Sequence, residues 1–234
     1  MITEPEIRAH LVEVSHRLHR EGFVAATDGN LSVRLPGDLV LVTRSAVPKN
    51  EVTEEDIVKI DLTGRVLSGS GRPSSELAVH LAAYRVRPDV RAVIHAHPVT
   101  CVAFSLSGLS LAGCLLPEVV LDLGTIPTAE YATPGTERAA EVVARELRTA
   151  SAVVMDRHGS ITVGRDLDEA YNRLERMEHA ARITHLAMQL GPVRKLSPAE
   201  LEELLARKRA RGELAGVENC NSCGACLVGE LRRA

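Results

Sequence analysis

The chain has 234 residues, 45% apolar residues and a formal net charge of −3, which suits one domain or at most two small ones with a sizeable core. With 2% aromatic residues, no tryptophan and no long run of lysine or arginine, the sequence argues against a nucleic-acid-binding surface. No segment approaches the roughly 20 apolar residues of a membrane span, and the first residues lack a signal-peptide pattern. We therefore expect a cytoplasmic protein that binds neither nucleic acid nor a membrane.

The spacing of apolar residues predicts helices and short strands in mixed order. Thr3 and Glu6 form a capping box for the first helix, and Gly22 is a stop signal. The turn residues at 36–38 predict a hairpin between two strands. In chain order we expect helices at 3–21, 75–86, 99–106, 136–148, 167–190 and 197–209, and strands at 31–35, 39–43, 57–62, 91–95, 152–156 and 160–163.

These elements lack regular alternation of parallel strands and helices, so they predict an α/β domain with three layers. A central, mainly antiparallel sheet would be flanked by helices on its two faces. The composition changes after Arg211, which places the domain at residues 1–211 and a cysteine-containing tail at 212–234. The tail cysteines could bind zinc or part of an iron–sulfur cluster, form a redox pair or have no role; they are Cys220, Cys223 and Cys226.

The stretch at 92–98 reads as a buried strand that ends in two histidines. Because side chains alternate along a strand, His95 and His97 should point the same way. A third histidine, His158, precedes Gly159 in a turn between two predicted strands. Three imidazoles with one open position are typical of catalytic zinc. The alternative is that each is an ordinary surface or core histidine.

Small polar residues gather at three other places, 27–32, 43–46 and 71–76. The last of these stands at the expected start of a helix, where free N–H groups and the helix dipole favour an anion such as phosphate. The simpler interpretation is that Ser74 or Ser75 is an ordinary N-cap and that the other two places are turns.

Five short motifs occur in one order: Gly-Asn-Leu-Ser-Val-Arg at 29–34, Pro-Ser-Ser-Glu at 73–76, His-Ala-His at 95–97, Tyr-Ala-Thr-Pro-Gly-Thr at 131–136 and His-Gly at 158–159. Together they resemble the class II aldolase/adducin family over about residues 5–210. The resemblance implies that His95, His97 and His158 bind Zn²⁺. It implies that Glu76 is the catalytic acid/base and can also ligate the metal. The implied phosphate-binding positions are Gly29, Asn30, Ser45, Ala46, Ser74 and Ser75.

The resemblance further implies a zinc-dependent aldolase that acts on a sugar phosphate, in a homotetramer with active sites at subunit interfaces. Zinc as a Lewis acid would stabilise the charge that develops when the carbon–carbon bond of a ketose 1-phosphate breaks. The products would be dihydroxyacetone phosphate and an aldehyde. The substrate would be L-fuculose 1-phosphate or a related deoxy-ketose phosphate.

Three alternatives on the same scaffold stay open. A pentulose-phosphate 4-epimerase is disfavoured because epimerases carry aspartate at the position of Glu76. A methylthioribulose-1-phosphate dehydratase and a non-catalytic adducin-type module are the other two. The chain also departs from the fuculose enzyme, which has Thr-Gly at the position of Ser45-Ala46. That enzyme also uses a tyrosine from a neighbouring subunit as the proton donor to the leaving aldehyde. The tyrosine falls near the position of Leu116 or Pro117, where this chain has none.

Overall fold

The computed structural model describes residues 3–210, and the tail that carries Cys220, Cys223 and Cys226 lies outside them. Its helices are α1 (Glu4–Arg20), α2 (Leu77–Val86), α3 (Val99–Leu106), α4 (Pro117–Asp122), α5 (Glu137–Leu147), α6 (Leu167–Leu190), α7 (Pro198–Ala210) and the short 3₁₀ helix η1 (Glu54–Asp56). Its strands are β1 (Asn30–Leu35), β2 (Leu39–Thr43), β3 (Ile57–Asp61), β4 (Val66–Ser68), β5 (Ala92–Ala96), β6 (Thr128–Ala129), β7 (Ala152–Met155) and β8 (Gly159–Gly164). Each helix and strand expected from the sequence is present to within a few residues.

The strands form one sheet of eight, in the order β4-β3-β2-β1-β5-β8-β7-β6. Every neighbouring pair is antiparallel except β6 and β7, which run parallel. The central pair β1 and β5 sets Asn30 opposite His95. The mainly antiparallel sheet predicted from the sequence is confirmed, and its centre carries two of the candidate site residues.

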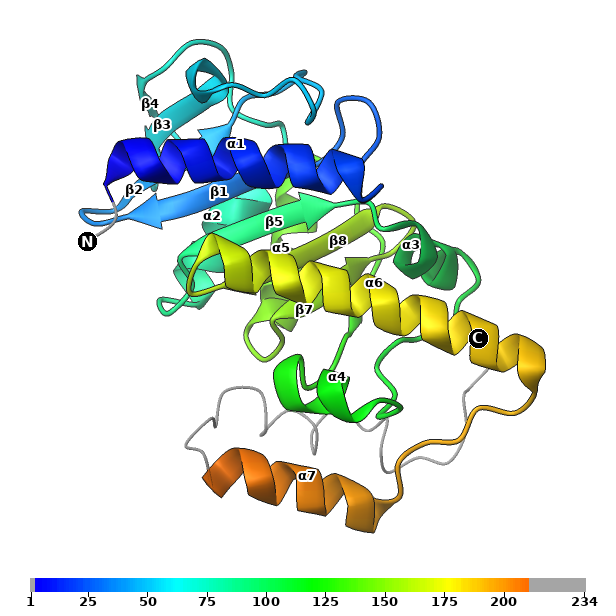
Figure 1. Cartoon of the computed structure of the whole chain (residues 1–234). Coiled ribbons are helices and arrows are strands. Elements are labelled where there is room, and N and C mark those ends of the chain that lie inside the picture. Colours follow the sequence, from blue (N-terminus) through cyan, green and yellow to red (C-terminus); the bar gives the residue numbers. More distant parts are fainter. Residues whose placement is uncertain (1–2, 211–234) are drawn as a thin grey trace.

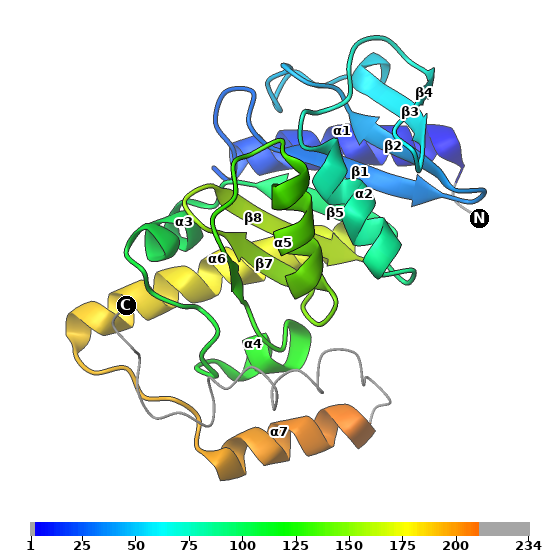
Figure 2. The same ribbon diagram turned by 180° about the vertical axis from the view of Figure 1, so that it is seen from behind.

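Helices cover both faces of the sheet, as expected for a three-layer α/β domain. Figure 1 shows α1 and α6 in front of the sheet, and Figure 2 shows α2 and α5 over the opposite face. Alternate residues of β5 serve the two layers: Ile94 packs on the side of α1 and α6, and Val93 on the side of α2 and α5. His95 is therefore held on the α2 side of the sheet by the strand's period of two.

The N-terminal helix shows why these residues form this layer. Thr3 and Glu6 make the predicted capping box, which satisfies free N–H groups of the first turn. Leu11, Val14 and Leu18 recur at helical spacing and are buried against the sheet. Each buried leucine stabilises the layer by about 1.5–3 kcal/mol relative to an exposed one.

Two features differ from the expectation. The helix α2 begins at Leu77 with Glu76 at its N-cap, and no side chain caps it. The interpretation of Ser74 or Ser75 as an ordinary N-cap is therefore wrong, because both lie in a turn before the helix. The short elements β4, β6, α4 and η1 were not expected, since segments of two to six residues carry too few apolar repeats to show a period.

The C-terminal helix α7 packs away from the sheet. Leu201 and Leu205 meet Cys114 and Val120 in a small apolar cluster that joins α7 to the α4 region (Figure 1). Cys101 belongs to the main core, and both Cys101 and Cys114 are buried. Among residues 3–210, none of the helices is both long enough and apolar enough to cross a membrane.

Candidate metal centre

Three histidines meet at the end of strand β5, near the centre of the sheet. His95 is the second-last residue of β5, His97 follows the end of that strand, and His158 lies in the turn between β7 and β8. Their ring centroids are 4.8–5.0 Å apart. One nitrogen of each ring lies within 4.8 Å of one nitrogen of the others. The convergence of His95 and His97 predicted from alternation is confirmed.

The partners of the outer ring nitrogens set the tautomers. The Nδ1–H of His95 donates to the carbonyl oxygen of Ser160 at 2.9 Å, and Nδ1 of His97 lies 3.4 Å from Oδ2 of Asp28. Protons on these nitrogens leave the Nε2 lone pairs free for a metal. The Nε2 atoms of His95 and His97 are only 3.0 Å apart. Two lone pairs facing at this distance repel each other unless a cation neutralises them, so the donor set fits a divalent metal.

Glu76 completes the cluster from the opposite side. Its Oε2 lies 2.9 Å from Nε2 of His95, and its Oε1 lies 3.4 Å from Nε2 of His158. The side chain of Glu76 is 12% exposed, and its buried Oε1 has no hydrogen-bond partner. A carboxylate oxygen with no donor, directed at imidazole lone pairs, also points to a bound cation.

The electrostatic setting favours the ionised form of Glu76 and the neutral forms of His97 and His158. Burial alone would raise the pKa of Glu76, but the adjacent His95 and His158 rings and the Asn30 amide outweigh it and lower the pKa to about 2. Burial lowers the pKa of His97 to about 4 and also lowers that of His158, with the charge of His95 adding to both effects. Neutral imidazoles and an ionised carboxylate are the forms that bind metal near neutral pH.

Gly159 lets the three rings approach one another. A Cβ atom built on it would lie 2.5 Å from the backbone oxygen of Ala96, 2.6 Å from Cδ2 of His97 and 3.0 Å from Cε1 of His95. Only a residue without a side chain fits there, because two of these contacts are with rings of the histidine cluster.

Gly159→Ala is therefore expected to push the histidine rings apart and weaken metal binding by about 10–100-fold, as lost support of metal ligands commonly does. Overpacking should also cost about 1–3 kcal/mol of unfolding free energy. A metal titration followed by competition with a chelator measures the first effect. Gly113→Ala is a matched control, because Gly113, like Gly159, lies outside the left-handed region and a Cβ there would come no closer than 3.7 Å to Leu115. Wild-type metal affinity in Gly159→Ala would show that the rings do not need this approach.

The residues predicted to bind phosphate lie in loops near the histidine cluster and Glu76. Gly29 has φ +74°, and a Cβ there would lie 2.6 Å from Val24 and 2.9 Å from the backbone oxygen of His95. Asn30 follows it and donates from Nδ2 to Oε2 of Glu76 at 3.3 Å. The Gly29–Asn30 pair therefore contacts both the histidine strand and the carboxylate.

The two remaining loops are joined to each other by backbone contacts. Ser45 donates its N–H to the carbonyl oxygen of Arg72 at 2.9 Å, and Arg44 bridges to Pro73. Ser74 accepts the Glu76 N–H at 3.3 Å. Ser45, Ala46 and Ser75 are exposed. Ala46 adopts φ +61°, a left-handed backbone typical of glycine, at the position where the resemblance predicts a glycine in the fuculose enzyme.

Comparison with known proteins identifies the family to which these motifs belong. Residues 9–185 match the family model described as "Class II Aldolase and Adducin N-terminal domain". The chain belongs to this family. The matched region contains every residue of the histidine cluster, Glu76 and the loops around them, so the predicted resemblance is confirmed.

Relatives within the class II aldolase/adducin family carry two kinds of name. The L-fuculose phosphate aldolase of Escherichia coli is 34% identical over 209 residues, which is 88% of this chain and 96% of the relative. The 3-oxo-tetronate 4-phosphate decarboxylase of Escherichia coli is 31% identical over 207 residues, 86% of this chain and 96% of the relative. Both are lyases, and the chain is accordingly an enzyme of the lyase class.

Solved structures agree with this assignment. A structure described as L-fuculose 1-phosphate aldolase superposes with a TM-score of 0.82 at 30% identity, covering 89% of this chain and 98% of the other. The L-fuculose-1-phosphate aldolase structure from Thermus thermophilus gives a TM-score of 0.70 at 35% identity, with 80% and 97% covered. The α/β fold expected from the sequence is thus confirmed.

The structure adds partners that sequence reasoning missed. Asp28 and the carbonyl of Ser160 orient the two histidines, and neither contact has a local sequence signal. His80, on α2, is fully buried beside Asn30. Its spacing of one helical turn from Glu76 was a usable signal, because residues four apart lie on the same face of a helix.

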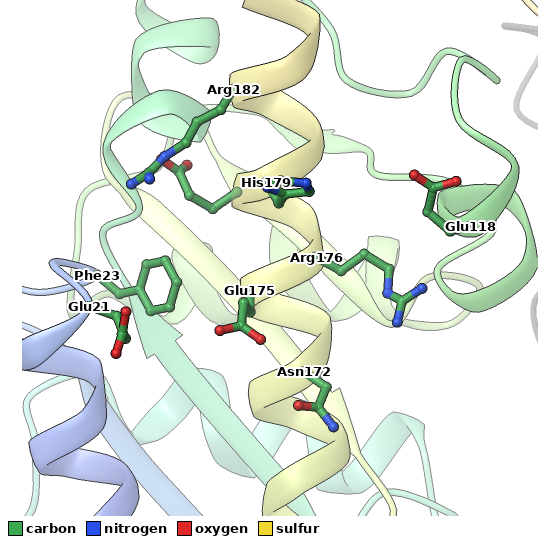
Figure 3. Close-up of a pocket in the computed structure, with 9 residues that line it drawn as sticks. Glu21, Phe23, Glu118, Asn172, Glu175, Arg176, His179 and Arg182 are labelled. Carbon is green, nitrogen blue, oxygen red and sulfur yellow. The ribbon is translucent and has the colours of Figure 1, made fainter.

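A separate cavity of about 530 Å³ lies along α6, away from the histidine cluster. Figure 3 shows its lining side chains, which come from α6, α4 and the end of α1. It contains none of the residues predicted for the site in this aldolase-family chain. Phe23 links the two places, because its backbone oxygen accepts the His97 N–H at 2.8 Å.

Proposed function

We propose that the protein is a zinc-dependent lyase that cleaves a carbon–carbon bond in a sugar phosphate and releases dihydroxyacetone phosphate. One observation carries the proposal: the Nε2 atoms of His95 and His97 lie 3.0 Å apart, with His158 and the Glu76 carboxylate at the same point. Three imidazoles beside one carboxylate are suited to hold a Lewis acid next to a proton acceptor.

In this proposal His95, His97 and His158 hold the metal, and Glu76 occupies a ligand position until substrate arrives. A bound divalent metal supplies Lewis-acid stabilisation of negative charge on substrate oxygen. Glu76, ionised because its pKa is lowered to about 2, accepts a proton from the carbon next to the carbonyl, or returns it after cleavage. Asn30 holds the carboxylate in place from the other side.

The phosphate group would bind where three loops meet, at Gly29, Asn30, Ser45, Ala46, Ser74 and Ser75. Support comes from the backbone contacts that join the loops and from the exposure of the hydroxyl-bearing residues Ser45 and Ser75. Turns of this kind present N–H groups to anions. Binding the phosphate away from the reacting bond would hold that bond at the metal.

The first candidate reaction is retro-aldol cleavage of L-fuculose 1-phosphate or a related deoxy-ketose phosphate. The hydroxyl that becomes the aldehyde would give its proton to the Glu76 carboxylate, the carbon–carbon bond would break, and its electron pair would stay on the dihydroxyacetone phosphate carbon. Glu76 would then pass that proton to the carbon. The pentulose-phosphate epimerase and methylthioribulose-1-phosphate dehydratase reactions remain alternatives at the same site.

The second candidate reaction is decarboxylation of a 3-oxo-tetronate 4-phosphate. Two observations support it. One relative carries this name at 31% identity. The resemblance places the proton-donor tyrosine of the fuculose enzyme near Leu116 or Pro117, where α4 begins, and no tyrosine lies there. Carbon dioxide leaves without a proton transfer to oxygen, so decarboxylation does not require such a donor. The electron pair again stays on the dihydroxyacetone phosphate carbon, which then takes a proton from solvent.

The experiment that tests the proposal uses the metal-loaded full chain against a panel of ketose 1-phosphates and 3-oxo-tetronate 4-phosphate. Both candidate reactions are expected to release dihydroxyacetone phosphate, which a coupled dehydrogenase reports. Aldehyde with it identifies an aldolase, and carbon dioxide identifies a decarboxylase. Product analysis with ribulose 5-phosphate and methylthioribulose 1-phosphate covers the alternatives. No dihydroxyacetone phosphate from any substrate would refute the lyase proposal.

We also propose a homotetramer in the cytoplasm, with a catalytic domain at 1–211 and a separate tail at 212–234. Exposed apolar side chains on α3 and at the end of α6 support subunit contacts there: Val99 is 66% exposed, Leu106 64%, Leu186 57% and Leu190 91%. Apolar residues gathered on exposed helices are typical of interaction surfaces.

A further inference from the structure

A continuous line of buried polar side chains runs from Glu76 into the interior of the protein. Oδ1 of Asn30 lies 2.5 Å from Nε2 of His80. Nδ1 of His80 lies 2.7 Å from Oγ of Ser32, which in turn lies 2.7 Å from the hydroxyl of Tyr84. Asn30, Ser32, His80 and Tyr84 are each at most 4% exposed. They connect β1 to α2 between the sheet and its covering helix.

The direction of every hydrogen bond in this line follows from its ends. Nδ2 of the Asn30 amide faces Oε2 of Glu76 at 3.3 Å and donates to it, since an amide nitrogen can only donate. Oδ1 of Asn30 then faces His80 and must accept from Nε2–H. Burial lowers the pKa of His80 to about 3, so the ring is neutral and carries one proton. Nδ1 of His80 must therefore accept.

The far end of the line agrees with this assignment. Ser32 donates its hydroxyl proton to Nδ1 of His80 and accepts from the Tyr84 hydroxyl. Burial raises the pKa of Tyr84, so that its proton stays in place as a donor. All donors point toward Glu76. The buried polar side-chain atoms of Asn30, Ser32, His80 and Tyr84 all have partners, as buried networks require.

We infer that His80 is a positioning residue, whose Nε2–H fixes the Asn30 amide so that its Nδ2–H holds the Glu76 carboxylate beside the metal ligands. A flipped amide would set its oxygen against the carboxylate and its N–H against Nε2–H of His80. His80 thus makes one of the two amide orientations strongly unfavourable. The inference rests on the proposed role of Glu76 as the acid/base.

Packing alone does not account for this arrangement. Apart from His80 and Tyr84, the buried residues of α2 are apolar and fill the layer: Val79, Leu81, Ala82 and Ala83. A leucine at position 80 would bury more apolar surface and would need no partners. These hydrogen-bonded side chains instead connect Glu76, which faces the candidate metal site, to the interior of the domain.

The test compares His80→Asn with His80→Gln in the metal-loaded full chain. The glutamine amide reaches about as far as Nε2 of histidine and can still donate to Asn30, whereas the asparagine amide reaches only about as far as Nδ1. We expect His80→Asn to slow solvent-deuterium exchange into dihydroxyacetone phosphate by about 100-fold, the cost of a misplaced catalytic group. His80→Gln should recover most of the rate. Metal content should stay at the wild-type level in both variants.

Ser32→Ala supplies a second variant if His80→Asn fails to fold. It removes the donor to Nδ1, frees His80 to change tautomer, and should lower the exchange rate by about 10-fold. Wild-type exchange in His80→Asn or in Ser32→Ala would overturn the inference. Equal losses in His80→Asn and His80→Gln would also overturn it, because a purely structural histidine does not distinguish a reaching donor from a short one.

The tautomer of His80 gives a readout that does not depend on the proposed reaction. In the chain labelled with ¹⁵N-histidine, the signal missing from His80→Gln belongs to His80. A proton on Nε2 supports the line of hydrogen bonds, and a proton on Nδ1 overturns it. If the wild-type protein exchanges no deuterium into dihydroxyacetone phosphate, the proposed function fails, and the hydrogen-bond line is then judged by this spectrum alone.

Discussion

His97→Ala is expected to abolish stable metal binding and to lower kcat/KM by at least about 1,000-fold, since the lost Lewis acid contributes several kcal/mol and each 1.36 kcal/mol is a factor of ten. His97 lies at the mouth of the cluster, 25% exposed, whereas His95 is 1% exposed. Its removal leaves the packed core intact. Metal content by atomic spectroscopy and the release of dihydroxyacetone phosphate measure the two effects.

The control for this variant is His19→Ala, which removes an exposed histidine of α1. It should keep wild-type metal content and activity. In metal-free protein, the unfolding free energies of both variants and the wild type should agree within about 1 kcal/mol, as is usual for substitutions outside the core. Full activity of His97→Ala after chelation would contradict the metal assignment.

The sequence predicts most of the site because the candidate metal ligands follow from local sequence patterns. His95 and His97 converge because side chains alternate along a strand. His158 joins them because the hairpin of β7 and β8 returns the chain to the end of β5. The order of strands was not available from periodicity. Only the pairing of β5 with both β1 and β8 shows that Asn30 and Ser160 flank His95.

The parts that sequence reasoning missed depend on tertiary contacts. In the sequence Asp28 is one polar residue of a turn, and only the structure shows that its carboxylate lies 3.4 Å from Nδ1 of His97. Ser74 and Ser75 looked like helix caps because they precede the apolar spacing of α2. The helix begins later, at Leu77, since the preceding residues pair with the loop at Arg44 and Ser45. At these positions the contacts between the two loops outweigh the local preference for a helix start.

Glu76→Gln is expected to stop proton transfer while leaving the metal in place. General-base catalysis contributes about 100–10,000-fold, so deuterium exchange into dihydroxyacetone phosphate should fall by a factor in that range. The three histidines remain, and glutamine has nearly the size of glutamate, so metal content and folding should not change. Nuclear magnetic resonance of dihydroxyacetone phosphate in deuterated solvent measures the exchange rate directly.

Two further variants make the result specific to this carboxylate. Glu141→Gln applies the same change to an exposed glutamate, 66% accessible at its side chain, and should leave exchange unchanged. Glu76→Asp keeps the charge but withdraws it by one methylene, and should retain more activity than Glu76→Gln. Unchanged exchange in Glu76→Gln would remove Glu76 from the mechanism, and with it the reason for holding its carboxylate through Asn30. If exchange is lost but metal is lost as well, Glu76 acts as a metal ligand rather than as the base.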